Sequence, residues 1–362
     1  MVKKNFRQAT ERNKALLSGK LRDGILFKAV VLNNPYHTRG AGEAIATREC
    51  LAVSDKEWII GDCRRQLTVY KDIDDDTVPT AYPTLHFGES VFPAMLGAEV
   101  SFWGHAGYTY SAAEPIVRGI DDLKCFDNYQ NSFWANTFRE SAEYFARHAN
   151  GEFYIRHFIT VDALNLAVEL MGATEAYLAV YEDEELLHEI MRRGVELNDW
   201  FYRMQKDVFA GNNRSALGDD AFYELYDKPW YSVDAYTLCS PETYDKLGFG
   251  YQRDLIGKIG GGTMHTHGTG LYELLPKIVK LEELQLAQAG RDLKGDRGIP
   301  IGELGRIREL AGDLPLSVRV TAREFLEGIK TKALPVNAEY YCEVKDIDEA
   351  NRLAIMAKEY HQ

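Results

Sequence analysis

Apolar and polar positions follow two periods along the chain, and the switch between them predicts alternating strands and helices. Short apolar runs that are rich in β-branched and aromatic residues and bounded by turn residues are typical of strands. In the first half of the chain these runs are Leu26–Leu32, Trp58–Asp62, Val100–Gly104 and Phe153–Thr160. Apolar residues at helical spacing, among many charges, then predict a long helix over Glu182–Val208.

The second half alternates more regularly. Its predicted strands are Ser232–Cys239, Gly261–His267, Leu284–Ala289, Leu316–Thr321 and Glu339–Val344. Its predicted helices start at Ser240-Pro241, cover Leu271–Lys280, Gly302–Ala311 and Arg323–Ile329, and run from the capping pair Asp346 and Glu349 to Glu359. Strands alternating with helices predict an α/β fold with a parallel sheet. About eight such units favour one (β/α)8 barrel domain over residues 1–362, with an N-terminal helical segment at 1–25.

Composition narrows the class of protein. Hydrophobic residues make up 45% of the 362 positions, which is enough for a sizeable core. The net charge of −13 argues against a nucleic-acid-binding surface and against an anionic membrane as partner. No apolar run approaches the roughly 18 residues of a membrane span. The five cysteines are scattered without a CxxC pair, so a reducing cytoplasm is expected. No GxGxxG or Walker sequence supports a nucleotide-binding sheet.

Two histidines, His265 and His267, stand at the end of a predicted strand. Residues i and i+2 of a strand point to the same face, so both imidazoles can converge on a divalent metal. Cys342 stands at the end of the last predicted strand, and in a closed barrel the strand ends share one rim. Two imidazoles and one thiolate would leave zinc a net charge of about +1 and an open fourth position. The alternatives are hydrogen-bonding histidines and a buried, apolar cysteine.

Other polar residues are weaker candidates. Asp234 could orient a histidine or act as a base, or it could bond to its own loop. Arg39 and His37 follow the first strand, where Arg39 could bind a carboxylate or lie on the surface. Glu303 could be a fourth ligand or a solvated helix charge. Structural roles are expected for His86, His105 and His157. The aromatic stretches Trp103–Tyr110 and Trp230-Tyr231 could line a pocket or simply pack.

The segment Gly261–Gly268 (GGTMHTHG) resembles the strand-end motif of the uroporphyrinogen decarboxylase superfamily. Ser240–Tyr244 resembles the Ser-Pro-Glu segment of that superfamily, Glu11–Lys20 its opening helix and Leu96–Phe102 an early strand region. The motifs are loose, but they occur in the right order over nearly the whole chain. The resemblance implies a single distorted (β/α)8 barrel.

Two branches of the superfamily differ in chemistry. The decarboxylases are metal-free and carry Arg-Gln-Ala-Gly-Arg after the first strand. Here Val31–Gly40 lacks this segment, and Arg7-Gln8-Ala9 lies too early. The zinc methyltransferases that act with corrinoid proteins carry His-x-Cys on this strand and a second cysteine near the last strand. His265, His267 and Cys342 fall on those positions, although His267 replaces the first cysteine.

This resemblance implies methyl transfer between a small molecule and a corrinoid (cobalamin) carried by a partner protein, in either direction. Because imidazole replaces thiolate at His267, the metal would be more electrophilic, which suits an oxygen or nitrogen substrate better than a thiol. Zinc is expected, and another divalent metal stays open. A lyase or decarboxylase on the same barrel is the alternative function, and a non-catalytic corrinoid- or ligand-binding protein is the third. A homodimer is also left open.

Overall fold

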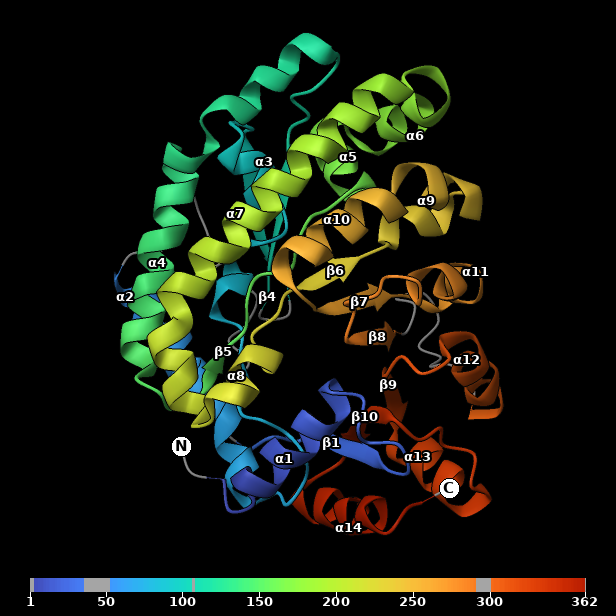
Figure 1. The fold of residues 1–362 in the computed structure, drawn as a ribbon. Helices are drawn as coiled ribbons and strands as arrows, with labels where there is room; N and C mark the ends of the chain where they lie inside the picture. Colours follow the sequence, from blue (N-terminus) through green and yellow to red (C-terminus); the bar gives the residue numbers. More distant parts are fainter. Residues whose placement is uncertain (1–2, 36–52, 106–107, 291–300, 362) are drawn as a thin grey trace.

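The computed structural model describes residues 3–35, 53–105, 108–290 and 301–361 (Figure 1). Its strands are β1 (Ile25–Val31), β2 (Thr80–Ala81), β3 (Val100–His105), β4 (Tyr108–Ala113), β5 (Tyr154–Ile155), β6 (Trp230–Ser232), β7 (Thr263–Thr266), β8 (Leu286–Ala289), β9 (Leu316–Thr321) and β10 (Ala338–Val344). The helices in the first half are α1 (Phe6–Leu17), α2 (Val53–Leu67), α3 (Val91–Met95), α4 (Phe133–Ala149), α5 (Leu164–Met171), α6 (Ala173–Glu182) and α7 (Glu184–Leu217). Those that follow are α8 (Asp220–Tyr226), α9 (Pro241–Leu247), α10 (Phe249–Ile259), α11 (Gly268–Ile278), α12 (Leu304–Ala311), α13 (Ala322–Thr331) and α14 (Ile347–Lys358).

A six-stranded parallel sheet is the centre of the fold. Its strand order is β1-β10-β9-β8-β7-β6, and helices cover its outer side (Figure 1). β2 and β5 form a separate parallel pair, and β3 and β4 form an antiparallel hairpin. This mixed α/β arrangement is consistent with a TIM-barrel-like fold, but the backbone pairing of the described strands is divided between two parallel sheets.

The two faces of the central sheet differ in chemistry. On one face, Ala29, Cys342 and Val320 are neighbours in register, and they belong to an apolar core packed against α12, α13 and α14. On the other face, Lys28, Tyr341 and Arg319 are neighbours, and they line a cavity. The alternation follows from the period of two along a strand. A second, larger apolar core packs α4, α5, α7 and α10 together.

The predicted elements of the second half are largely confirmed. β7, β8, β9, β10 and the helices α11 to α14 lie where the pattern places them, and Asp346 accepts a hydrogen bond from the Glu349 amide at 3.0 Å as a helix cap. The prediction for Ser232–Cys239 is wrong, because β6 ends at Ser232 and a 3-10 helix follows at Asp234–Leu238.

The first half departs further from the expected elements. Trp58–Asp62 lies inside α2, where Ile59 and Ile60 are buried in the core and Trp58 is partly exposed. Val100–Gly104 is extended as predicted, but it pairs with β4 in the hairpin outside the parallel sheet. Within Phe153–Thr160 only Tyr154–Ile155 pairs as a strand. The long helix is confirmed and extends to Leu217 as α7. None of the described helices is long and apolar enough to cross a bilayer.

Acidic side chains and a few backbone hydrogen bonds join the two parallel sheets where regular strand pairing ends. Between β1 and the segment before β2, the Phe27 amide donates to Asp76 Oδ2 at 3.0 Å and the Ala29 amide donates to Asp75 Oδ2 at 2.8 Å. Between β5 and β6, the Thr160 amide donates to the Trp230 carbonyl at 2.9 Å. We call these two junctions the β1–β2 seam and the β5–β6 seam. Carboxylates here satisfy strand N–H groups that would otherwise be buried without partners.

Asp162 belongs to the β5–β6 seam and is buried. Its carboxylate accepts hydrogen bonds from the Thr160 hydroxyl at 2.8 Å and from Gln252 Nε2 at 2.6 Å. Burial raises the pKa of Asp162 to about 6 and outweighs these hydrogen bonds and that of the Ser232 amide, which lower the pKa. The folded protein therefore holds this proton more tightly than the unfolded chain does.

Asp162→Asn is expected to remove a pH dependence of stability. Because the folded pKa of Asp162 lies above its unfolded value, the free energy of unfolding should fall as pH rises from about 4 to 6. The shift corresponds to a loss of about 3 kcal/mol across that window. The measurement is urea unfolding of both proteins between pH 4 and 7, taken as the difference between wild type and variant. A pH-independent difference would contradict the assignment.

Candidate metal centre

His265 and His267 meet at the carboxyl end of β7. The entry to this strand needs glycine, since Gly262 has φ +139 and a Cβ there would collide with the Tyr231 ring. His265 is the third residue of the strand, and His267 caps the amino end of α11. Their Nε2 atoms lie 2.9 Å apart, and each side chain is about three-quarters buried. The predicted convergence of the two imidazoles is therefore present.

Asp234 supplies a carboxylate to the same point. It lies two residues beyond the end of β6, at the start of the 3-10 helix. Its Oδ2 is 3.6 Å from His265 Nε2, and its Oδ1 is 3.5 Å from His267 Nε2. The ligand atoms of Asp234, His265 and His267 all lie within 4.8 Å of one another, so one cation can touch all three. We call these three residues the His–His–Asp cluster.

Gln288 fixes the orientation of His265. It is the register neighbour of His265 on β8, and its Oε1 meets His265 Nδ1 in a short hydrogen bond. An amide oxygen only accepts, so Nδ1 carries the proton and the lone pair of Nε2 points into the cluster. This is the arrangement by which an outer partner prepares a histidine for metal binding. Trp230 stacks near the same ring, with centroids 6.4 Å apart.

The cluster fits a divalent cation. Asp234 Oδ1 is buried, and no group of the described residues meets it with hydrogen-bond geometry. Burial alone would raise the pKa of Asp234, but His267, His265 and Ser232 together hold it below its usual value, so the carboxylate is charged. A charged carboxylate, two imidazole nitrogens and an unfilled acceptor match the ligands of zinc and of other transition metals.

Cys342, the expected third ligand, lies elsewhere. It is buried in the apolar core between the sheet and α12 to α14. On β10 the residues that share the face of His265 and Gln288 are Glu339, Tyr341 and Glu343, which alternate with Cys342. A strand sends successive side chains to opposite faces, so Cys342 is directed to the helices and Asp234 takes the third position.

The other sequence candidates lie outside the cluster. Arg39 and His37 fall outside the described residues. Glu303 is not in the cluster, and it accepts a short hydrogen bond from the Tyr272 hydroxyl. His157 is buried and bonds to Asp227 at 3.0 Å, as expected for a structural histidine. His86 packs edge-on against Trp58, and burial lowers its pKa to about 4.

Two glutamates near the cluster were not predicted. Glu89 and Glu169 line a cavity of about 310 Å³ that also touches Asp234. Burial, with the charge of Asp234, raises the pKa of Glu89, and burial, with the charge of Glu89, raises that of Glu169. Two acids with raised pKa values beside a metal-type cluster are typical of a reaction site. Neither stands in a recognisable motif, so only their position in the fold identifies them.

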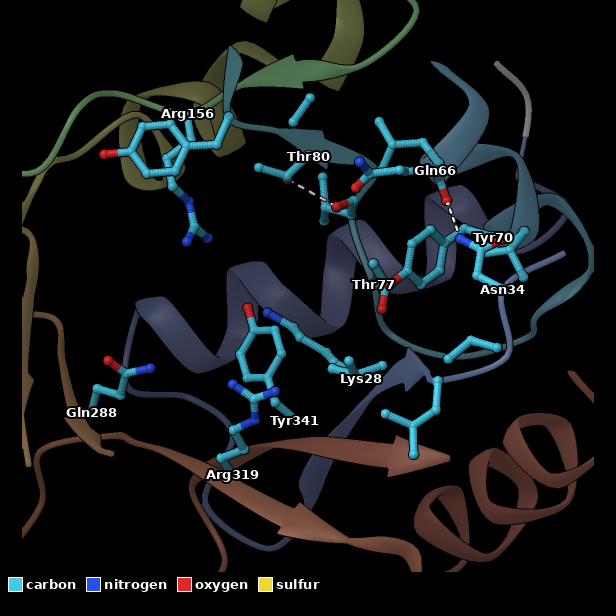
Figure 2. Close-up of a pocket in the computed structure, with 18 of the residues that line it drawn as sticks. Lys28, Asn34, Gln66, Tyr70, Thr77, Thr80, Arg156, Gln288, Arg319 and Tyr341 are labelled. Carbon is cyan, nitrogen blue, oxygen red and sulfur yellow. Dashed lines mark hydrogen bonds between the residues drawn. The ribbon is translucent and has the colours of Figure 1, made fainter. Parts of the chain in front are cut away.

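A second cavity of about 580 Å³ is lined in part by Gln288 (Figure 2). Residues of β1, β2, β6, β8, β9 and β10 line it, including Lys28, Thr80, Trp230, Arg319 and Tyr341. The His–His–Asp cluster is therefore adjacent to two cavities, and Gln288 links the larger one to His265.

Comparison with known proteins identifies the fold alone. No family model matches the chain, and no curated protein matches its sequence. A solved structure described as a methyltransferase from Methanosarcina mazei superposes with a TM-score of 0.60 at 9% sequence identity. The superposition covers 97% of this chain and 98% of that one. The two chains therefore share their architecture over nearly the full length.

Proposed function

We propose that this chain is a metal-dependent methyltransferase that moves a methyl group between a small molecule and a corrinoid carried by a partner protein. The observation that carries the proposal is the convergence of Asp234, His265 and His267 on one point. The shared architecture with a protein described as a methyltransferase supports it. We also propose that the two parallel sheets form one distorted (β/α)8 barrel, with the cluster at the carboxyl ends of β6 and β7, where such barrels place their chemistry.

Zinc is the proposed metal, and another divalent transition metal would suit the same ligands. Bound there, it would supply a Lewis acid with a net charge of about +1. The cluster holds no thiolate, since Cys342 lies on the other face of the sheet. A metal with only nitrogen and oxygen ligands is harder and more electrophilic, so we propose an oxygen- or nitrogen-bound methyl group as the reacting function.

Other residues of the chain would orient a metal ligand, balance charge and hold a proton. Gln288 orients His265, and Asp234 balances the positive charge of the site. When a methyl group leaves oxygen or nitrogen, that atom keeps the bonding electron pair and can take up a proton. Glu89, whose pKa is raised by burial, faces the smaller cavity beside Asp234 and would hold such a proton.

The test combines metal analysis with turnover. The purified chain is analysed by mass spectrometry for bound metal, then mixed with reduced cobalamin and a panel of O-methyl and N-methyl compounds. Methylcobalamin formation, followed by absorbance, should require the metal and disappear in His265→Ala. A native protein without metal, whose turnover is unchanged in His265→Ala, would overturn the proposal.

A lyase or decarboxylase remains the second candidate, because the larger cavity contains cationic side chains suited to a carboxylate. Release of carbon dioxide without any corrinoid would favour it over methyl transfer. The same metal-loaded preparation serves both assays, so the two functions are separated by whether turnover needs cobalamin.

A further inference from the structure

The larger cavity contains three cationic side chains, and two of them have acidic partners. Lys28 forms a short ion pair with Glu339, and Arg319 pairs with Glu343 at 2.9 Å. Arg156 also lines this cavity, yet in the described part of the chain no carboxylate lies within ion-pair distance of it. Among the described residues that line the cavity, Arg156 is therefore the cation without an ion-pair partner. Arg156 is partly buried, and a positive charge that is partly removed from water without a partner is costly. An anion bound beside it would offset that cost.

The surroundings of Arg156 aim its guanidinium into the open space. Arg156 follows β5, and its backbone amide donates to the Ala81 carbonyl at 2.9 Å. Its guanidinium stacks on the Trp230 ring, 4.5 Å from the centroid. Figure 2 shows the guanidinium directed into the cavity, with the polar ends of Tyr341 and Lys28 directed into the same space from the opposite side. Stacking fixes the plane of the guanidinium and leaves its edge free for a planar, bidentate acceptor.

From this geometry we propose that the larger cavity binds a small aromatic monocarboxylate, with its carboxylate on Arg156 and the Tyr341 hydroxyl. A single cation without an ion-pair partner among the described residues matches a monoanion better than a phosphate dianion. Aromatic side chains also line the cavity, among them Tyr70 and Tyr82, and they offer apolar ring surface for the body of the ligand. A volume of about 580 Å³ is ample for one ring with substituents.

This site deepens the proposed function, because it places the substrate relative to the metal cluster. Trp230 lies 4.5 Å from the guanidinium of Arg156 and 6.4 Å from the His265 ring, so Arg156 and His265 are no farther apart than the sum of these distances. An aromatic ring with a carboxylate at one end and a methoxy or methylamino group at the other roughly spans that gap. Binding of the carboxylate at Arg156 does not depend on the proposed function. Only the reaction at the opposite end of the ligand rests on it.

The first test compares benzoate with benzamide, which has nearly the same shape and no charge. Each is titrated into the full-length chain, with binding measured by calorimetry and by the shift in melting temperature. Benzoate should bind and raise the melting temperature, and benzamide should bind at least about tenfold more weakly, because a charge-assisted hydrogen bond is lost. Equal affinities, or no benzoate binding, would overturn the proposal.

The second test uses a matched pair of arginine variants. Arg156→Gln should weaken benzoate binding about tenfold or more, whereas Arg319→Gln, in the same cavity but paired with Glu343, should change it less than about twofold. Arg156→Lys, which keeps the charge, should restore part of the affinity. Unchanged binding in Arg156→Gln would overturn the proposal. Benzoate binding needs neither metal nor cobalamin, so this result and the turnover assay succeed or fail independently.

Discussion

Replacing Asp234 by alanine is expected to empty the metal site, whereas replacing Cys342 by alanine is expected to leave it filled. Asp234 contributes a carboxylate within 3.6 Å of both imidazoles, and its loss removes the one negative ligand. Affinity for zinc should fall at least about tenfold, and His265→Ala and His267→Ala should reduce bound metal to near zero. The measurement is metal content after dialysis against a weak chelator.

Cys342→Ala is the matched control, because a sequence-based reading places the thiol in the ligand set and the structure places it in the apolar core. Its loss should lower stability by about 1–2 kcal/mol through the small cavity it leaves, without changing metal content. If Cys342→Ala lost the metal and Asp234→Ala kept it, Asp234 would not be a ligand of the site. Cys342 would then be the third ligand.

Asp75→Ala is expected to cost about 3–5 kcal/mol of folding stability, close to the largest effect of a single substitution. Asp75 pairs with Lys3, and both side chains are fully buried. The same carboxylate accepts the Ala29 amide at 2.8 Å across the β1–β2 seam. Alanine would leave a buried ammonium and a buried strand amide without this partner. Chemical denaturation would measure the loss, and the variant should unfold at markedly lower urea concentration.

The neighbouring residue supplies the control. Asp74 pairs with Lys358 at 2.8 Å, but 57% of its side chain is exposed. Surface ion pairs contribute little because water screens them, so Asp74→Ala should cost less than about 1 kcal/mol. Similar losses in the two variants would show that the β1–β2 seam does not depend on the buried pair.

Sequence pattern predicted the second half of the fold well and the first half poorly, for a physical reason. β8, β9 and β10 are hydrogen-bonded on both sides and four to seven residues long, so their alternation is visible. β2 and β5 pair over only two residues each, and side chains of Asp75, Asp76 and Asp162 replace part of the pairing around them. A strand that short has no periodicity to detect.

The site was predicted in part for a related reason. His265 and His267 are two residues apart in a predicted strand, so their side chains point to the same face. This prediction does not require knowledge of the tertiary structure. Assigning Cys342 needed the direction in which each face of β10 points. The strand alternates Glu339, Tyr341 and Glu343 with Tyr340, Cys342 and Val344, and only the structure shows that the apolar face with Cys342 packs on the helices. Asp234 was considered as a supporting group or base inside the predicted strand Ser232–Cys239. Neither its place after the end of β6 nor its distance to the histidines could be predicted from the sequence.

The seams have a consequence for how this architecture can vary. Hydrogen bonds between the backbones of paired strands do not involve side chains. Substitutions in a regular sheet therefore change the strength of this pairing little. At the β1–β2 and β5–β6 seams, by contrast, the side chains of three aspartates supplement a few backbone hydrogen bonds. Single substitutions there can tighten or loosen the joint between β2–β5 and the rest of the sheet. Because the cavity of Figure 2 borders that joint, evolution or design could adjust access to it without altering the residues that bind the ligand.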